Sequence, residues 1–191
     1  VGSEMCIRDR YVLGDMIDRG PDPVGVIKLV RSLPNARVLK GNHEQIMLDA
    51  IIGQDPLDAE TWDINGGWTT RQQLNDMEFE AYEELVRWMA TLPLYAVVET
   101  DERPYLLVHA GIQTETARAF LLEHGVDCAD GTGAVDVDRE LLKQMLAVQS
   151  SDDLLWIRHG YWDAPTGLLS AEGKGPVVVS GHTPTVSLGR Y

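Results

Sequence analysis

Cysteine, long apolar runs and positive charge are all scarce in this chain. The two cysteines among its 191 residues, Cys6 and Cys128, form no recognisable disulfide framework, which is typical of a reducing compartment. No apolar run approaches the roughly 18 residues of a membrane-spanning helix, and the opening stretch VGSEMCIRDR lacks the apolar core of a signal peptide. These absences predict a cytoplasmic protein without a membrane partner.

Basic residues are outnumbered by acidic ones. Lys and Arg total 16 against 30 Asp and Glu, so the formal net charge is −14. This charge argues against nucleic acid or an anionic membrane as a partner. It does not exclude a phosphorylated substrate, because a local arginine cluster or a metal ion overrides the global sign. The composition, 44% hydrophobic and 24% charged, is that of an ordinary globular domain.

The apolar pattern predicts an α/β protein. Short buried-type strands are expected at 11–13 and 37–39, each followed by a loop and a helical pattern, at 24–33 and 44–52. A polar, mostly helical stretch at about 55–92 is interpreted as an inserted cap, and its residues around Trp62 to Thr70 are expected to set substrate size. Further along, we expect a hairpin of strands at 94–99 and 104–108, helices at 115–123 and 138–147, and a strand at 177–180.

The chain begins in an unusual way. Residues 1–10 have no helix or strand pattern, and the first predicted strand starts at once at Tyr11. We therefore predict that residues 1–10 are a non-native segment and that one domain spans 11–191.

Four polar clusters each follow a predicted strand. They read Gly-Asp-Met-Ile-Asp-Arg-Gly at 14–20, Gly-Asn-His-Glu at 41–44, Val-His-Ala-Gly at 108–111 and Gly-His-Thr-Pro at 181–184. Ligands of α/β sheets bind at the carboxyl ends of strands, so the clusters are expected to converge. Alone, each histidine is more simply a core or capping residue and each aspartate a cap or turn residue. Three of five histidines at equivalent strand ends are harder to explain in that way.

The side chains offered by these clusters suit a metal ion. Asp15, Asn42, His109 and His182 provide one carboxylate, one amide oxygen and two imidazoles. This set of ligands fits Mn²⁺, Fe or Zn²⁺ better than a metal that prefers thiolates. His124 and His159 have no such context and are left unassigned.

The order of these motifs resembles the calcineurin-like metallophosphoesterases, and more narrowly their bacterial and phage serine/threonine phosphoprotein phosphatases. The resemblance covers Tyr11 to about Leu188. It implies a β-sandwich flanked by helices, with a dinuclear metal centre at one edge. It also implies that Asp15 bridges two divalent ions, with Mn expected and Fe or Zn possible. Asn42, His109 and His182 would complete the ligands of the second ion.

The resemblance also implies catalytic roles. Arg19 is expected to clamp phosphate together with Arg158, which lies in a Trp-Ile-Arg stretch like the Trp-x-Arg of the family. His43 would be the general acid that protonates the leaving group, and Asp18 is placed to orient it. A metal pair would hold an activated hydroxide and stabilise both oxygens of an in-line displacement.

One motif of the family is missing. The Gly-Asp-x-His-Gly that supplies two ligands of the first metal has no counterpart, since no Asp-x-His occurs in the chain. Because the downstream motifs are complete, we interpret this as loss of an N-terminal strand and helix and not as decay of an enzyme. The chain as printed is therefore expected to be a poor phosphatase.

Three functions remain open. The first is a metal-dependent phosphomonoesterase, a serine/threonine protein phosphatase. The second is a symmetrical diadenosine polyphosphate hydrolase, which the same motifs admit. The third is a non-catalytic phosphoprotein-binding module, which would keep Arg19 and Arg158 but need no hydroxide.

Overall fold

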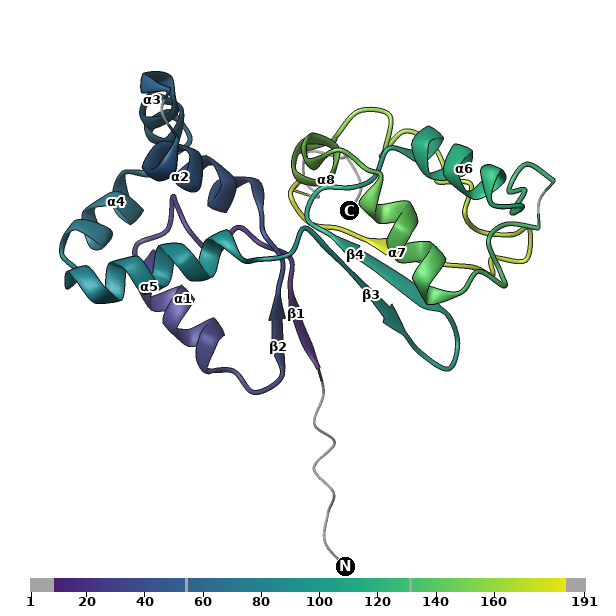
Figure 1. The fold of residues 1–191 in the computed structure, drawn as a ribbon, viewed down its shortest axis with the longest axis horizontal. Coiled ribbons are helices and arrows are strands. Elements are labelled where there is room, and N and C mark those ends of the chain that lie inside the picture. Colours follow the sequence, from purple (N-terminus) through teal and green to yellow (C-terminus); the bar gives the residue numbers. More distant parts are fainter. Residues whose placement is uncertain (1–8, 54, 131, 185–191) are drawn as a thin grey trace, which may run out of the picture. The chain divides into compact units, whose positions relative to one another are not determined.

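The computed structural model describes residues 9–53, 55–130 and 132–184 (Figure 1). The predicted non-native segment therefore lies, up to residue 8, outside the described residues. The chain divides into two compact units, Val1–Leu92 and Pro93–Tyr191, which are described in turn. No helix of the described residues combines the length and the apolar character needed to cross a membrane.

The first unit begins with a parallel β-α-β arrangement. Strands β1 (Arg10–Val12) and β2 (Ala36–Val38) pair in parallel, with Tyr11 opposite Arg37. Helix α1 (Pro23–Ser32) connects them, and it starts where Asp22 accepts a hydrogen bond from the backbone N–H of Gly25 at 3.0 Å. The parallel pairing brings the carboxyl ends of the two strands, and the loops that follow them, to the same edge.

Among the described residues of this unit, four further helices follow. Helix α2 (Asn42–Ile52) follows β2 almost directly, and the predicted helical cap contains α3 (Pro56–Ile64), α4 (Trp68–Asn75) and α5 (Phe79–Ala90). One apolar core joins them, because every helix of the unit contributes a buried side chain to it. Its members include Ile27, Met47, Trp62, Leu74 and Met89.

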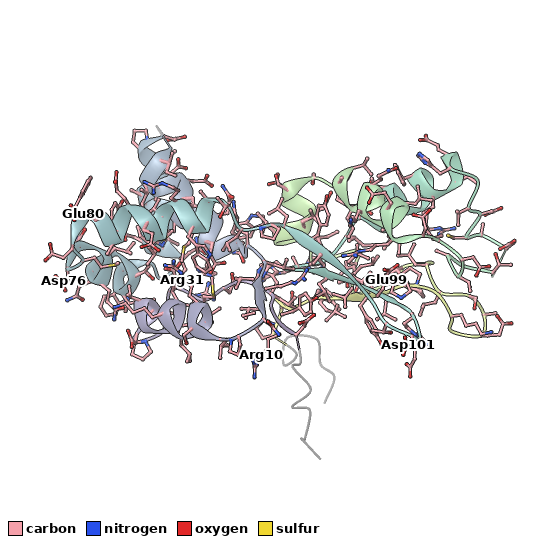
Figure 2. The ribbon with its side chains drawn as sticks, turned by 60° about the horizontal axis from the view of Figure 1, so that its bottom comes forward. Arg10, Arg31, Asp76, Glu80, Glu99 and Asp101 are labelled. Carbon is pink, nitrogen blue, oxygen red and sulfur yellow. The ribbon has the colours of Figure 1, made fainter. Side chains whose placement is uncertain are left out.

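The second unit has its own sheet, in the order β3-β4-β5. Strands β3 (Tyr95–Glu99) and β4 (Pro104–Val108) form the predicted hairpin, and β5 (Val177–Val179) pairs with β4 in parallel. The charged side chains of Glu99 and Asp101 lie at the exposed tip of this hairpin (Figure 2). The β4–β5 pair, like the β1–β2 pair, places two carboxyl ends side by side.

Helices α6 (Thr114–Glu123), α7 (Arg139–Ala147) and α8 (Ser151–Trp156) pack with this sheet around a second core. The core joins Leu106 of β4 to Leu121, Leu142 and Leu154 of the three helices. Helix α8 was not expected from the sequence, because its six residues are too few to show a helical period. It starts where the hydroxyl of Ser150 accepts from the backbone N–H of Asp153 at 3.0 Å.

The predicted α/β class is confirmed, and the predicted strands and helices are found within a few residues of their expected bounds. The packing of the two sheets as a sandwich stays a prediction. So does the loss of an N-terminal strand and helix.

Candidate functional site

The loops after β1 and β2 pack closely against each other. Gly14 has a φ of +90°, and a Cβ at this position would overlap the backbone of Gly41. A Cβ at Gly41 would in turn overlap the carboxylate of Asp15. Only glycine allows this approach at both positions. Two of the four predicted clusters therefore meet because each contributes a residue without a side chain.

Glu44 ties these two loops together. Its Oε2 accepts from the backbone N–H of Asp15 at 2.9 Å and of Gly41 at 2.7 Å, and its Oε1 accepts from that of Met16 at 2.7 Å. The side chain is fully buried. Burial raises the pKa of the Glu44 carboxyl, while the hydrogen bonds from Asp15 and Met16 oppose that rise. Glu44 thus fixes the backbone of the loop after β1 and of the loop after β2.

Asp15 and Asn42, two of the predicted metal ligands, occupy these loops. Asn42 is the first residue of α2 and is 3% exposed, whereas Asp15 is exposed. The backbone N–H of His43 donates to Oδ1 of Asp15 at 3.2 Å. The Asp15 carboxylate therefore lies at the N-terminus of α2. The positive end of the helix dipole stabilises its negative charge there.

His43 and Asp18 form a buried pair. Nδ1 of His43 lies 2.7 Å from Oδ2 of Asp18, and the two side chains are 5% and 0% exposed. A carboxylate on Nδ1 orients the ring, so the Nε2 atom is the one left to act on a substrate. The roles of His43 as general acid and of Asp18 as its orienting carboxylate stay predictions.

Arg19 lies beside this pair but is exposed to solvent. Its backbone N–H donates to the carbonyl of Gly66 at 3.1 Å, and its Nε donates to the carbonyl of Asn65 at 3.2 Å. These bonds fix the Arg19 backbone and the Nε atom of its side chain. The two terminal nitrogens of the guanidinium form a planar fork of donors that suits a bidentate phosphate contact.

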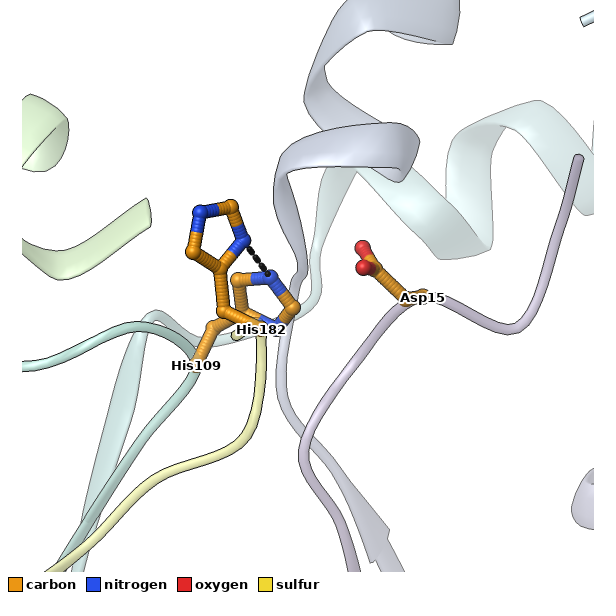
Figure 3. Close-up of side chains that lie close together, drawn as sticks. All are labelled: Asp15, His109 and His182. Carbon is orange, nitrogen blue, oxygen red and sulfur yellow. Dashed lines mark hydrogen bonds between the residues drawn. The ribbon is translucent and has the colours of Figure 1, made fainter. Parts of the chain in front are cut away.

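In the second unit, the parallel β4–β5 pair brings two predicted ligands together. His109 follows β4, His182 follows β5, and the backbone N–H of Gly181 donates to the carbonyl of His109 at 2.8 Å. Nε2 of His109 lies 3.1 Å from Nδ1 of His182. Figure 3 shows the two rings, with this hydrogen bond as a dashed line. Residues 73 positions apart therefore meet through strand pairing.

Arg158 reaches the same histidine pair. Its Nε donates to Nε2 of His182 at 3.0 Å, and the Trp156 ring lies edge-on to the His182 ring, with centroids 6.1 Å apart. An arginine side chain is always a donor, so Nε2 of His182 accepts this hydrogen bond. The Trp-x-Arg stretch thus contacts one of the predicted metal ligands within this unit, while the role of Arg158 as a phosphate clamp stays a prediction.

The donor set of the histidine pair fits a metal ion. Two nitrogens bound to one ion at about 2.0–2.1 Å lie about 3.0–3.4 Å apart for ligand angles of roughly 90–110°. The separation of 3.1 Å between the His109 and His182 nitrogens falls in this interval.

Backbone strain coincides with the predicted site. Among residues 9–53, 55–130 and 132–184, the non-glycine residues with positive φ are Asp15, Asp18, Arg19, Asn35 and His182. Four of these five are predicted site residues. A left-handed conformation in a non-glycine residue costs of order 1–3 kcal/mol, and such residues cluster at functional sites.

Sequence reasoning missed three residues of this arrangement. Glu44 stood in a recognised motif but received no role, although its position three residues after Gly41 is the spacing of a capping box. Trp62 and Thr70 were expected to limit substrate size, yet both are buried against Asp18. No local signal in the sequence indicates that contact.

The two unassigned histidines have plain surroundings. Nδ1 of His124 lies 2.8 Å from the carbonyl of Phe120, and the two rings stack with centroids 4.2 Å apart. His159 is exposed.

Comparison with known proteins adds a family. The sequence pattern of the calcineurin-like phosphoesterases matches residues 7–190. The symmetrical bis(5'-nucleosyl)-tetraphosphatase of Aeromonas hydrophila is 28% identical over 163 residues, which are 82% of this chain and 48% of that protein. Serine/threonine-protein phosphatase 1 of Salmonella typhimurium is 34% identical over 105 residues, 54% of this chain and 46% of that protein.

A third relative, serine/threonine-protein phosphatase 2 of Escherichia coli, is 33% identical over 99 residues, 51% of this chain and 43% of that protein. In each of these three relatives the matched part is less than half of the whole protein.

Proposed function

The chain belongs to the calcineurin-like phosphoesterase family, and we propose from this premise that it acts as a metal-dependent phosphomonoesterase of the cytoplasm on phosphoserine and phosphothreonine. The observation that carries the proposal is the backbone strain at Asp15, Asp18, Arg19 and His182. Strain of this kind persists only where the surrounding structure holds it, and here it falls on residues with the chemistry that phosphoester hydrolysis needs.

The metal ligands of the proposal are Asp15, Asn42, His109 and His182. They would hold one divalent ion, with Mn²⁺ first and Fe or Zn²⁺ as alternatives, and Asp15 would share its carboxylate with a second ion. When bound, such a metal pair supplies a hydroxide and stabilises the charge of the phosphoryl group. The 3.1 Å separation of the histidine nitrogens supports this assignment for His109 and His182.

The remaining residues act on the substrate. Arg19 and Arg158 bind the phosphate oxygens, and His43 protonates the serine or threonine oxygen as it leaves. Asp18 keeps the His43 ring in the orientation that directs Nε2 at that oxygen. The buried 2.7 Å contact between His43 and Asp18 supports these last two roles.

A second candidate substrate is a symmetrical bis(5'-nucleosyl) tetraphosphate. The relative that aligns over 82% of this chain carries that name, whereas the two protein phosphatases align over 54% and 51%. The same metal and arginine chemistry would cleave its phosphoanhydride. Because a nucleotide leaving group needs less help from an acid than a serine alkoxide does, His43 would matter less for this substrate.

The test compares both substrates on the chain and on the full-length protein that contains it. With Mn²⁺ present, a phosphoserine peptide should be hydrolysed faster than bis(5'-adenosyl) tetraphosphate. EDTA and the His109→Ala variant should abolish hydrolysis, whereas the matched His124→Ala variant should not. Preference for the tetraphosphate would establish the second candidate, and phosphopeptide binding without hydrolysis would indicate a binding module.

A further inference from the structure

The Asp18 carboxylate accepts hydrogen bonds from two side chains in addition to its contact with His43. Nε1 of Trp62 donates to both of its oxygens, at 3.1 and 3.2 Å, and Oγ1 of Thr70 donates to Oδ1 at 2.7 Å. These donors come from α3 and α4, 44 and 52 residues further along the chain. All of the side chains involved are buried, so none of these bonds competes with solvent.

Thr70 holds Asp18 at two points. Its hydroxyl accepts from the backbone N–H of Asp18 at 2.9 Å and donates to the carboxylate of the same residue. The indole N–H of Trp62 is a donor only, and Trp62 is 3% exposed, so it needs the acceptor that Asp18 provides. The three hydrogen bonds leave Oδ2 directed at Nδ1 of His43.

The turn between α3 and α4 binds Arg19, the residue that follows Asp18 in the chain. The carbonyls of Asn65 and Gly66 accept from Nε and the backbone N–H of Arg19. A Cβ at Gly67 would overlap the indole ring of Trp62, so the turn packs directly on that ring. One short stretch of the helical segment, 62–70, thus contacts both Asp18 and Arg19.

We infer that residues 62–70, which read Trp-x-x-Asn-Gly-Gly-x-x-Thr, form a positioning element for Asp18 and Arg19. Trp62 and Thr70 are positioning residues, which act on catalysis through Asp18 and the orientation of the His43 ring. The inference rests on the proposed role of His43 as general acid. A buried carboxylate held by three hydrogen bonds from two further donors cannot rotate freely, so it keeps the imidazole within the narrow range of angles that proton transfer needs.

A purely structural role makes a different prediction. If Trp62 and Thr70 only stabilised the unit, their loss would lower the amount of folded enzyme and reduce the hydrolysis of every substrate alike. If they position His43, the loss depends on the leaving group, because p-nitrophenolate leaves without a proton and an alkoxide does not.

The first experiment uses the full-length protein with Mn²⁺ and measures kcat and KM. Thr70→Val and Trp62→Phe should lower kcat on a phosphoserine peptide about 10- to 100-fold, as misplacement of a catalytic group does. KM should stay nearly constant and kcat on p-nitrophenyl phosphate should change far less. Thr70→Ser, which restores the hydroxyl, should recover most of the loss. In an Asp18→Asn background, Thr70→Val should have no further effect.

The chain offers matched controls. Oγ1 of the neighbouring Thr69 has no hydrogen-bond partner among the described residues, and Trp88 lies in α5 beneath the guanidinium of Arg31. Thr69→Val and Trp88→Phe should leave kcat on both substrates unchanged. An equal loss on both substrates in Thr70→Val, or no recovery in Thr70→Ser, would overturn the positioning role.

A second measurement separates this inference from the proposed function. The Nδ1 proton of His43 can be followed by NMR without any substrate. It should exchange slowly with solvent in the wild type and in Thr69→Val, and quickly in Thr70→Val and Trp62→Phe. An inactive wild type would refute the proposed phosphatase activity alone. Unchanged exchange in both variants would refute the inference, whatever the activity.

Discussion

The carboxylate of Glu44 accepts a hydrogen bond from the backbone N–H of Asp15 at 2.9 Å, across 29 residues of the chain. The contact joins the loop after β1 to the first turn of α2. The buried Glu44 side chain therefore holds the backbone beside Asp15, a predicted metal ligand.

Replacing Glu44 with Gln should destabilise the first unit. The carboxylate accepts three backbone N–H groups, and an amide must turn its NH₂ toward at least one of them. We expect a loss of about 1–3 kcal/mol in the free energy of unfolding, the cost of leaving a buried donor unsatisfied. Urea unfolding measures it, with the exposed Glu60→Gln as control. Equal midpoints for the two variants would contradict the role given to Glu44.

His43→Asn should affect turnover more than metal content. As the general acid, His43 is expected to contribute about 10²- to 10⁴-fold to the rate. The variant should bind Mn²⁺ as the wild type does, and lose activity mainly on phosphoserine and little on aryl phosphates. Elemental analysis and steady-state kinetics test this, with His124→Asn as control. Loss of metal in His43→Asn would make His43 a ligand instead.

Arg158→Lys should not preserve function. Nε of Arg158 donates to His182, which leaves the terminal nitrogens of the planar fork for phosphate. A lysine provides one point charge and cannot do both. We expect kcat/KM to fall roughly 10- to 100-fold, the equivalent of one lost hydrogen bond to a charged group. The exposed Arg87→Lys in α5 is the control. Near-normal kinetics in Arg158→Lys would exclude the bidentate clamp.

Cys128 should be a slow thiol at neutral pH. Burial raises the pKa of its thiol, while the guanidinium of Arg118 partly opposes the rise. The thiolate is the reactive form, so alkylation by iodoacetamide in a Cys6→Ser background should be slower than for a peptide thiol and should accelerate with pH. Reaction as fast as that of the peptide would contradict the shift.

The raised pKa of Cys128 also makes the free energy of unfolding depend weakly on pH. The folded state holds the Cys128 proton more tightly than the unfolded chain does. This contribution is therefore complete below the pKa of the unfolded thiol and is lost as the pH rises through that of the folded one. The wild type should thus lose more stability over that range than Cys128→Ser does, as measured by urea unfolding.

Much of the fold follows from local pattern. The alternation of strand and helix over 11–52 and the hairpin at 94–108 depend on apolar periods and turn residues that neighbouring positions reveal. The short helix α8 was not predicted, because its six residues show no helical period. It depends on the Ser150 cap and on burial of Leu154. The pairing of β5 with β4 joins residues about 70 positions apart, which no local window contains.

The sequence by itself determined which side chains follow which strands, and its motif order is that of the family to which the chain belongs. Only the tertiary structure decided which of these residues meet within a unit, and which others hold them. Glu44, Trp62 and Thr70 received no catalytic or positioning role from the sequence, yet they bond Asp15 and Asp18 across 29 to 52 residues. The reason is physical: the apolar period of a strand or helix shows which of its faces is buried, but it does not show which distant segment will pack against that face and form hydrogen bonds there.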